Sequence, residues 1–192
     1  MNALIVAAGR SRRFGLANKL LAPVAGRPLI VVSVSRVLAA TRGPVTLVLG
    51  HEAHRIAAAL ARHGVLTHPR LKIARNRHPR AGMAASLDTA LDAAPRLDSA
   101  VTVYLADMPN IVAGKDRVLA RAVRAGWPVA RVGAGHRPGH PVRLRRSAIA
   151  AHAKPGRLAR TAKALRHATC VIEVPTRAII DVDTRQMIRS LI

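Results

Sequence analysis

Short apolar runs alternate with longer amphipathic stretches along this chain, and no other feature restricts its fold as strongly. Short continuous apolar runs are typical of strands buried on both faces. The longer stretches have helical spacing, and glycine or proline stands near several of their ends. The expected strands cover residues 3–7, 45–49, 71–74, 100–105, 128–132, 141–144 and 170–174, and the expected helices cover 29–40, 52–62, 86–94, 115–125, 158–167 and 184–190.

This repeated strand–helix order predicts an α/β fold, because parallel neighbours in a sheet need a crossover connection between them. We expect a three-layer, Rossmann-like, mostly parallel sheet with helices on both faces. Neither a repeat nor a low-complexity linker divides the sequence, so residues 1–192 are expected to form a single domain. Residues 131–146, rich in Arg, Pro and Gly, are the most loop-like part of the chain.

The net charge is extreme and indicates polyanionic partners such as nucleic acid or phosphorylated small molecules. It reaches +23, from 32 Lys and Arg against 9 Asp and Glu. Only Phe14, Tyr104 and Trp127 are aromatic, which is too few for a platform that stacks bases. Because no long basic run occurs either, we interpret the charge as a surface bias and expect no specific nucleic-acid binding.

Cysteine content and apolar run length exclude several other classes. With Cys170 alone, the chain can form neither an internal disulfide nor a cysteine-based zinc site. No apolar run approaches the length of a membrane span. The first apolar stretch, residues 3–8, is followed by arginines, whereas a signal peptide has its positive charges before the apolar region. A cytoplasmic protein without a membrane partner is therefore expected.

Ligands of open α/β sheets bind beyond the carboxyl ends of the strands, so the loops after strands are the first places to search. The loop at residues 7–15 is rich in Gly and Arg, and Lys19 follows it. Free amides there can face phosphate oxygens, and Arg13 and Lys19 add positive charge. The glycine spacing matches neither the dinucleotide nor the Walker pattern, so a solvated turn is the alternative interpretation.

Two further strand ends carry scarce acidic residues. Asp107 follows the strand at 100–105, and Asp181 and Asp183 follow an apolar pair near the end of the chain. Carboxylates at such positions suit Mg²⁺, which prefers hard oxygen ligands and bridges to substrate phosphates. The alternatives are a turn or capping role for Asp107 and an N-cap role for Asp183.

Two more segments could line a pocket at the same edge. Gly82 and Ser86 stand where the free amides of a helix N-terminus could face a ligand. Residues 136–141 form a basic, turn-rich segment that contains His140, although a lone histidine is more often a surface or core residue.

Several of these residues belong to a series of motifs, which are Ala7-Ala8-Gly9-x-Ser11-x-Arg13-x-Gly15, Lys19-Leu20-Leu21, Gly26-x-Pro28-Leu29, Gly82-Met83-x-x-Ser86-Leu87, Leu105-x-Asp107-Met108-Pro109, Gly139-His140-Pro141-Val142 and Asp181-x-Asp183-Thr184. Their order resembles that of MobA-like nucleotidyltransferases over nearly the whole chain. The sequence is most similar to the MocA-type molybdenum cofactor cytidylyltransferases.

The resemblance implies the nucleotide-diphospho-sugar transferase type of fold and a Mg²⁺-dependent reaction. In that reaction an NTP and a phosphorylated acceptor give a nucleotide-linked product and pyrophosphate. The start Ala-Ala-Gly favours CTP, the implied acceptor is a molybdopterin-type cofactor, and molybdoenzyme maturation proteins are possible partners. The implied catalytic residues are Arg13, Lys19 and Asp107; the implied nucleotide-binding residues are Ala7, Ala8, Gly9, Ser11, Arg13, Gly15, Lys19, Gly82 and Ser86; the implied acceptor-binding residues are Gly139, His140 and Pro141; and the implied metal ligands are Asp107 with Asp183, or Asp181 in its place.

Some positions depart from the family pattern, and other functions therefore stay open. Residues 153–158 lack the acid that the family usually has before its late helix, and Arg185-Gln186 replaces the common Pro-Glu. One alternative is a guanylyltransferase, or a transferase for another phosphorylated metabolite. Another is a non-catalytic, polyanion-binding relative. A redox enzyme ranks last, because the chain has no flavin or nicotinamide fingerprint.

Overall fold

The chain is built around one seven-stranded sheet, seen in a computed structural model that describes residues 2–9, 14, 17–78, 82–96, 98–152 and 156–189. The strand order is β5-β4-β1-β6-β8-β7-β9. Its strands are β1 (Asn2–Ala7), β4 (Val45–Leu49), β5 (Leu71–Arg75), β6 (Ala100–Leu105), β7 (Val129–Ala134), β8 (Arg137–Arg145) and β9 (Thr169–Glu173). All neighbours pair in parallel except β8, which is antiparallel to both β6 and β7. The expected mostly parallel sheet is confirmed.

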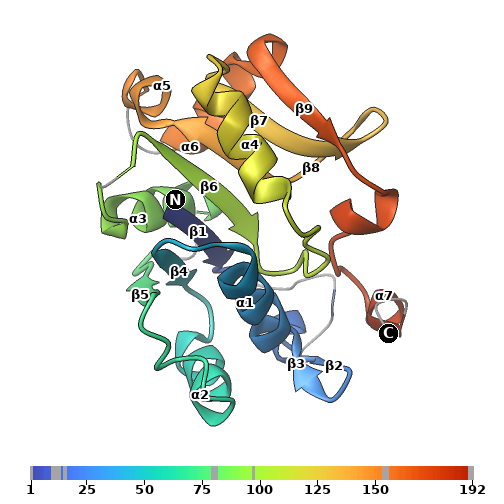
Figure 1. Cartoon of the computed structure of the whole chain (residues 1–192). Helices are drawn as coiled ribbons and strands as arrows, with labels where there is room; N and C mark the ends of the chain where they lie inside the picture. Colours follow the sequence, from blue (N-terminus) through green and yellow to red (C-terminus); the bar gives the residue numbers. More distant parts are fainter. Residues whose placement is uncertain are drawn as a thin grey trace.

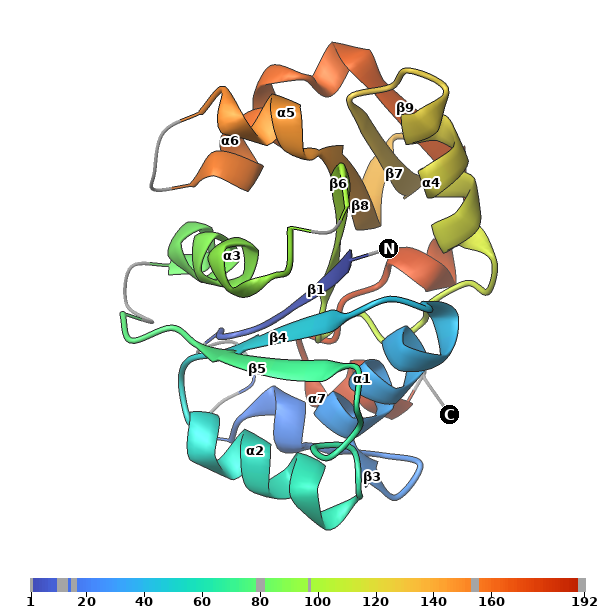
Figure 2. The ribbon, with the colours of Figure 1, turned by 60° about the vertical axis from the view of Figure 1, so that its left-hand side comes forward.

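Helices cover both faces of this sheet, as expected (Figure 1). In Figure 2, α1 (Leu29–Ala40) and α4 (Lys115–Arg124) lie on one side, and α3 (Gly82–Ala93), α5 (Arg146–Ala150) and α6 (Arg157–Ala164) lie on the other. Two helices remain. Helix α2 (Ala53–Arg62) lies towards the β5 end of the sheet. Helix α7 (Arg185–Arg189) lies beside the small hairpin of β2 (Pro23–Val24) and β3 (Arg27–Pro28). Among the described residues, no helix is long and apolar enough to cross a membrane.

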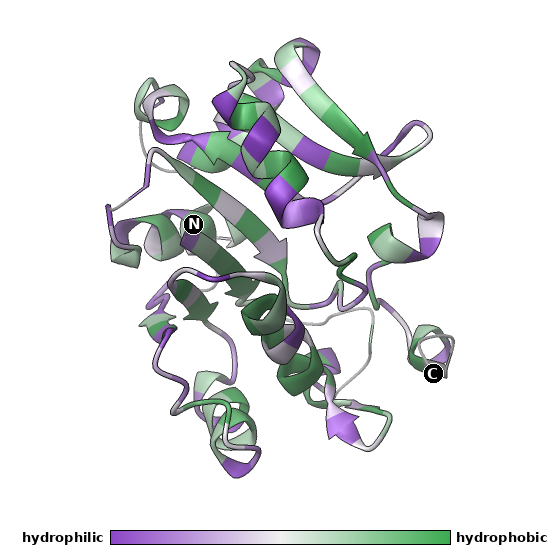
Figure 3. Cartoon of the chain, viewed as in Figure 1, coloured by the Kyte–Doolittle hydropathy of each residue, from purple (hydrophilic) through white to green (hydrophobic). Residues whose placement is uncertain are grey.

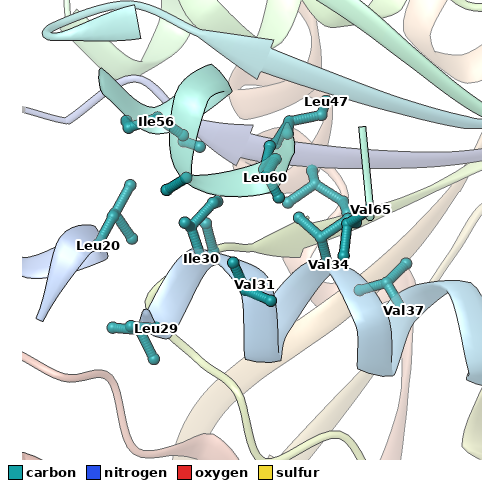
Figure 4. Close-up of a cluster of buried hydrophobic side chains, with 14 of the residues drawn as sticks. Leu20, Leu29, Ile30, Val31, Val34, Val37, Leu47, Ile56, Leu60 and Val65 are labelled. Carbon is teal, nitrogen blue, oxygen red and sulfur yellow. The ribbon is translucent and has the colours of Figure 1, made fainter. Parts of the chain in front are cut away.

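The central strand β1 shows why the sheet needs a layer on each side. All six of its residues are buried, and successive side chains point to opposite faces. Leu4 and Val6 join the cluster under α3 and α6, whereas Ile5 joins the cluster under α1 and α2. Figure 4 shows side chains of α1 and α2 meeting in this second cluster. Apolar residues fill the sheet and the inner faces of the helices, and polar residues face outwards on helices such as α4 (Figure 3).

The strands expected at residues 128–132 and 141–144 are confirmed as parts of β7 and β8, but the loop-like interpretation of the wider stretch 131–146 is wrong, because most of it forms the hairpin of these two strands. Its turn is at Gly135, which has a positive φ of 55° that glycine adopts without strain. Arg, Pro and Gly suggest a loop when read in isolation. Strand β8, however, has a hydrogen-bonded neighbour on each side, and this pairing outweighs the weak local preference.

Smaller differences concern the ends of helices. Helix α3 begins at Gly82, four residues before the expected start at Ser86. Helix α6 ends at Ala164, and a separate 3₁₀ turn, Arg166–Ala168, follows it. Two more 3₁₀ turns, η2 (Lys19–Leu21) and η5 (Thr176–Ile179), occur where no regular element was expected.

Candidate active site

Lys19 lies between two carboxylates at the carboxyl ends of β1 and β6. Its Nζ is 2.7 Å from Oδ2 of Asp107 and 3.0 Å from Oδ1 of Asp183. The three side chains are 13%, 24% and 16% exposed, so the cluster is shielded but open to a ligand. Three residues that the sequence places in separate loops thus meet at one point.

Backbone hydrogen bonds hold the two acidic segments side by side. The amide of Ala106 donates to the carbonyl of Val6 at 3.1 Å, which continues the sheet as far as Asp107. The amide of Val182 donates to the carbonyl of Asp107 at 2.8 Å. Val182 itself is completely buried and anchors the segment that carries Asp183.

Asp107 lies in the turn after β6, where the amide of Met108 donates to the carbonyl of Leu105 at 3.2 Å, as the turn interpretation expected. Asp107 precedes the start of α4, Lys115, by several residues. At the start of α7, the Oγ1 atom of Thr184 accepts the amide hydrogen of Met187 at 3.4 Å. Both carboxylates contact Lys19.

The backbone of Lys19 is fixed by the turn η2. The side chain of Asn18 caps this turn, since its Oδ1 accepts the amide hydrogen of Leu20 at 3.0 Å. Burial lowers the pKa of Lys19, but the charges and hydrogen bonds of Asp107 and Asp183 outweigh it and raise the pKa above the usual value. Lys19 is therefore fully charged at neutral pH.

Two converging carboxylates fit a divalent cation that takes its remaining ligands from a substrate. Asp107 and Asp183 both have an oxygen within 3.0 Å of one ammonium, so their oxygens approach a common point. Within the described ranges, no three His, Cys, Asp or Glu side chains form a possible metal-holding group, so Asp181 does not complete one. Mg²⁺ is commonly held by one or two carboxylates together with substrate phosphates, and the pair suits that arrangement.

The loop after β1 is only partly described. Ala7 and Ala8 are buried at the end of β1, and Gly9 is exposed beyond them. The predicted nucleotide-binding residues Ser11, Arg13 and Gly15 lie outside the described residues, so their roles stay predictions.

Gly82 and Ser86 lie at the expected helix N-terminus, in the first turns of α3. Gly82 is exposed, whereas Ser86 is 2% exposed. The hydroxyl of Ser86 donates to the carbonyl of Gly82 and accepts from Nδ2 of Asn76 at 2.9 Å. Ser86 thus joins the end of β5 to α3, and its predicted contact with the nucleotide remains a prediction.

The predicted acceptor-binding residues lie on β8, with a close packing contact behind them. A Cβ added to Gly139 would lie 2.8 Å from the Cβ of Ile179 and closer still to its Cγ2. Nδ1 of His140 is 3.2 Å from the carbonyl oxygen of Val103. Burial lowers the pKa of His140, although this carbonyl and Asp107 oppose the shift, so the ring is neutral at pH 7.

Two cavities are lined mostly by residues that the sequence patterns did not indicate. A cavity of about 520 Å³ lies where β4 and β5 end and is lined by Gly50, Arg75, Asn76 and Arg77. Another, of about 500 Å³, is lined mainly by apolar residues, with Phe14, Asn18 and Arg55 among them. Arg75 and Arg77 could have been found from the sequence, because they closely follow the strand expected at residues 71–74 and so lie at the carboxyl edge of the sheet.

The sequence model of the MobA-like NTP transferase domain matches residues 3–173. The chain belongs to this family. It is 36% identical to the bifunctional protein GlmU of Agrobacterium fabrum over 132 residues, which are 68% of this chain but only 28% of that protein. Rv0371c of Mycobacterium tuberculosis H37Rv shares the fold, with a TM-score of 0.79 at 23% identity over 100% of this chain and 97% of that one. A structure of Rv0371c from the same organism in complex with manganese has a TM-score of 0.77 at 22% identity, over 99% of this chain and 96% of that one.

In this MobA-like domain, the late helix α6 begins without the usual preceding acid, and an acid from another helix caps it instead. Oδ2 of Asp88, on α3, accepts the amide hydrogen of Gly156 at 2.6 Å, and Oδ1 accepts that of Arg157 at 3.2 Å. Residues 153–155 lie outside the described residues.

Proposed function

We propose that this MobA-like protein transfers a nucleotidyl group from an NTP, with CTP expected, to a phosphorylated acceptor of the molybdopterin type, releasing pyrophosphate. The placement of Lys19 between Asp107 and Asp183 carries the proposal. It supplies one flexible cation for a polyphosphate and two hard-oxygen ligands for a metal, at the edge of the sheet where such folds bind nucleotides.

The chemistry needs positioning and charge neutralisation rather than a protein nucleophile. An oxygen of the acceptor phosphate attacks the α-phosphorus in line, the bond from this phosphorus to the β-phosphate oxygen breaks, and pyrophosphate carries the released charge away. Lys19 and Arg13 offset the negative charge of the triphosphate, and the amides near Gly9 and Gly82 bind phosphate or nucleoside groups. Gly139, His140 and Pro141 face the acceptor.

Mg²⁺ is the expected metal, held by Asp107 and Asp183. It supplies charge stabilisation to the reacting phosphates when bound. The manganese complex of Rv0371c supports a divalent cation at this type of fold. The preference for Mg²⁺ follows from the all-oxygen ligands.

The choice of base and acceptor comes from the sequence motifs. Ala7-Ala8-Gly9 resembles the cytidylyl branch of the family, and the similarity to MocA-type proteins points to a molybdopterin acceptor. Lys19, Asp107 and Asp183 would serve equally with GTP as the donor or with another phosphorylated metabolite as the acceptor. The experiment below therefore compares donors and acceptors directly.

Pyrophosphate release, measured with each NTP in Mg²⁺ with and without molybdopterin, tests the proposal. We expect release with CTP only when the acceptor is present. Preference for GTP, or for a different acceptor, would change the specificity and keep the reaction. No NTP-dependent turnover with any acceptor would contradict the reaction itself and favour the polyanion-binding alternative.

The Asp107→Asn variant tests the metal assignment. It should fold normally and lose activity by roughly 100-fold or more, because it removes one of two charged metal ligands. Asp92→Asn, which changes a 44% exposed carboxylate on α3, is the matched control and should keep the wild-type rate. Full activity in Asp107→Asn would show that this metal assignment is wrong.

A further inference from the structure

We propose that Lys19 blocks the binding of uncomplexed divalent cations to the Asp107–Asp183 pair, so that the site accepts its metal only as a metal–triphosphate complex. The inference rests on the proposed function and defines the substrate of that site more narrowly. It assigns Lys19 two opposite effects, since the same ammonium would weaken binding of the metal alone and strengthen binding of the nucleotide complex.

The ammonium and a metal that shares its carboxylate oxygens would lie close together and repel each other. The ammonium contacts both carboxylates, at 2.7 and 3.0 Å. A Mg²⁺ ion bonds to carboxylate oxygens at about 2.1 Å, so one that used the same oxygens would lie within about 5 Å of Nζ. Two positive charges at such a short distance repel each other strongly in a partly buried site. A cation that uses these two oxygens therefore binds more strongly once Lys19 moves away.

Lys19 can move its ammonium while its backbone stays in place. The turn η2 and the Asn18 cap fix its Cα, and a lysine stem has several rotatable bonds. The backbone bond between Val182 and Asp107, by contrast, holds the two acidic segments together. Displacement of the ammonium thus leaves the carboxylate pair assembled for a metal.

A triphosphate provides the ammonium with a new partner, and a free metal ion does not. A bare cation must break the two charge-assisted contacts of Lys19 with Asp107 and Asp183, and it brings no anion to replace them. A metal–triphosphate complex brings phosphate oxygens that accept the displaced ammonium. Metal binding and nucleotide binding are then coupled through one residue, and the coupling is reciprocal.

Binding of Mn²⁺ alone, followed by electron paramagnetic resonance and calorimetry, tests this idea without any turnover. Lys19→Met should bind Mn²⁺ roughly tenfold or more tightly than wild type, the effect expected from removing one charge-assisted contact. The same variant should bind Mn²⁺ with a non-hydrolysable CTP analogue roughly tenfold more weakly. Lys163→Met removes an equal charge from an exposed position on α6 and should leave both affinities unchanged.

Two further samples locate the effect and guard against misfolding. Lys19→Met combined with Asp183→Asn should lose the gain in Mn²⁺ affinity, which shows that the gain arises at this carboxylate pair. Lys19→Gln keeps a polar side chain and replaces Lys19→Met if the latter unfolds. In wild type, the nucleotide analogue must raise the affinity for Mn²⁺, a comparison that needs no variant.

The outcomes separate this inference from the proposed function. If wild type binds Mn²⁺ alone as tightly as Lys19→Met does, or as tightly as with the nucleotide analogue, the blocking role of Lys19 is overturned while nucleotidyl transfer stands. If wild type binds no metal–nucleotide complex at all, the proposed function fails, and with it the inference.

Discussion

At the scale of single residues, Gly139 shows that packing can require a motif glycine. The close approach of η5 to β8 leaves no space for a side chain there, because a Cβ would overlap Ile179. We expect Gly139→Ala to destabilise the protein by about 1–3 kcal/mol, as overpacking does in a core. Urea unfolding of wild type and variant measures the difference.

A double-mutant cycle then identifies the cause. In an Ile179→Ala background, Gly139→Ala should lower the free energy of unfolding by less than it does in wild type, because the Cγ2 atom that the new Cβ would meet is absent. Strictly additive costs would mean that the contact with Ile179 does not explain this glycine.

His140 gives a pH-dependent prediction whose sign follows from its environment. Burial is the largest influence and lowers its pKa below 6.5, and Arg131 adds to this effect. Between the lowered pKa and 6.5, the unfolded chain binds the His140 proton and the folded protein does not, so stability falls as the pH falls through this range. His140→Gln should therefore lose less stability between pH 7 and pH 5 than wild type, as thermal unfolding can measure. An equal loss in both proteins would contradict the assignment.

At the scale of elements, α6 depends on a carboxylate supplied by α3. Asp88 is 6% exposed and binds the amides of Gly156 and Arg157, two of the unpaired donors at the start of α6. Asp88→Ala should destabilise the protein by about 1–3 kcal/mol, since it removes a cap and leaves buried donors unpaired. Denaturant unfolding gives the value.

Asp92 provides the comparison, because it bonds to the same Arg157 from an exposed position. Asp92→Ala should change the free energy of unfolding by less than about 1 kcal/mol, as exposed ion pairs usually do. Equal effects of the two substitutions would locate the stabilisation in the Arg157 ion pairs rather than in the helix cap.

The sequence predicts the sheet well wherever strands are short, apolar and buried on both faces, as β1, β4 and β6 are. It finds only part of β8, because the apolar pattern marks residues 141–144, whereas pairing with β6 and β7 extends the strand back to Arg137. Position after a strand selected Asp107, whereas Asp183 was selected after an expected strand end that the structure replaces with the 3₁₀ turn η5. Their meeting at Lys19 could not be predicted, since Asp183 is 164 positions from Lys19 and the arrangement depends on the bond from Val182 to Asp107.

At the scale of the whole molecule, part of the arginine excess serves the backbone. Arg70 donates to the carbonyls of Leu38 and Thr41 at the end of α1, at 2.7 and 2.6 Å. Arg145 donates in the same way to Val123, near the end of α4. Helix C-termini attract positive charge because their last carbonyls have no helical partner. These arginines therefore have a structural use that requires no polyanionic ligand.

The remaining surface charge should still attract nucleic acid without sequence preference. At a net charge of +23, we expect duplex DNA to bind at low salt and to weaken steeply as salt rises, because such binding releases condensed counterions. The dissociation constant should be about micromolar or weaker at physiological salt. Replacing the exposed Arg117 and Arg121 of α4 with Gln should reduce the salt dependence without affecting nucleotidyl transfer. Tight, sequence-selective binding at physiological salt would contradict a surface bias, since it would require base contacts that charge alone does not provide.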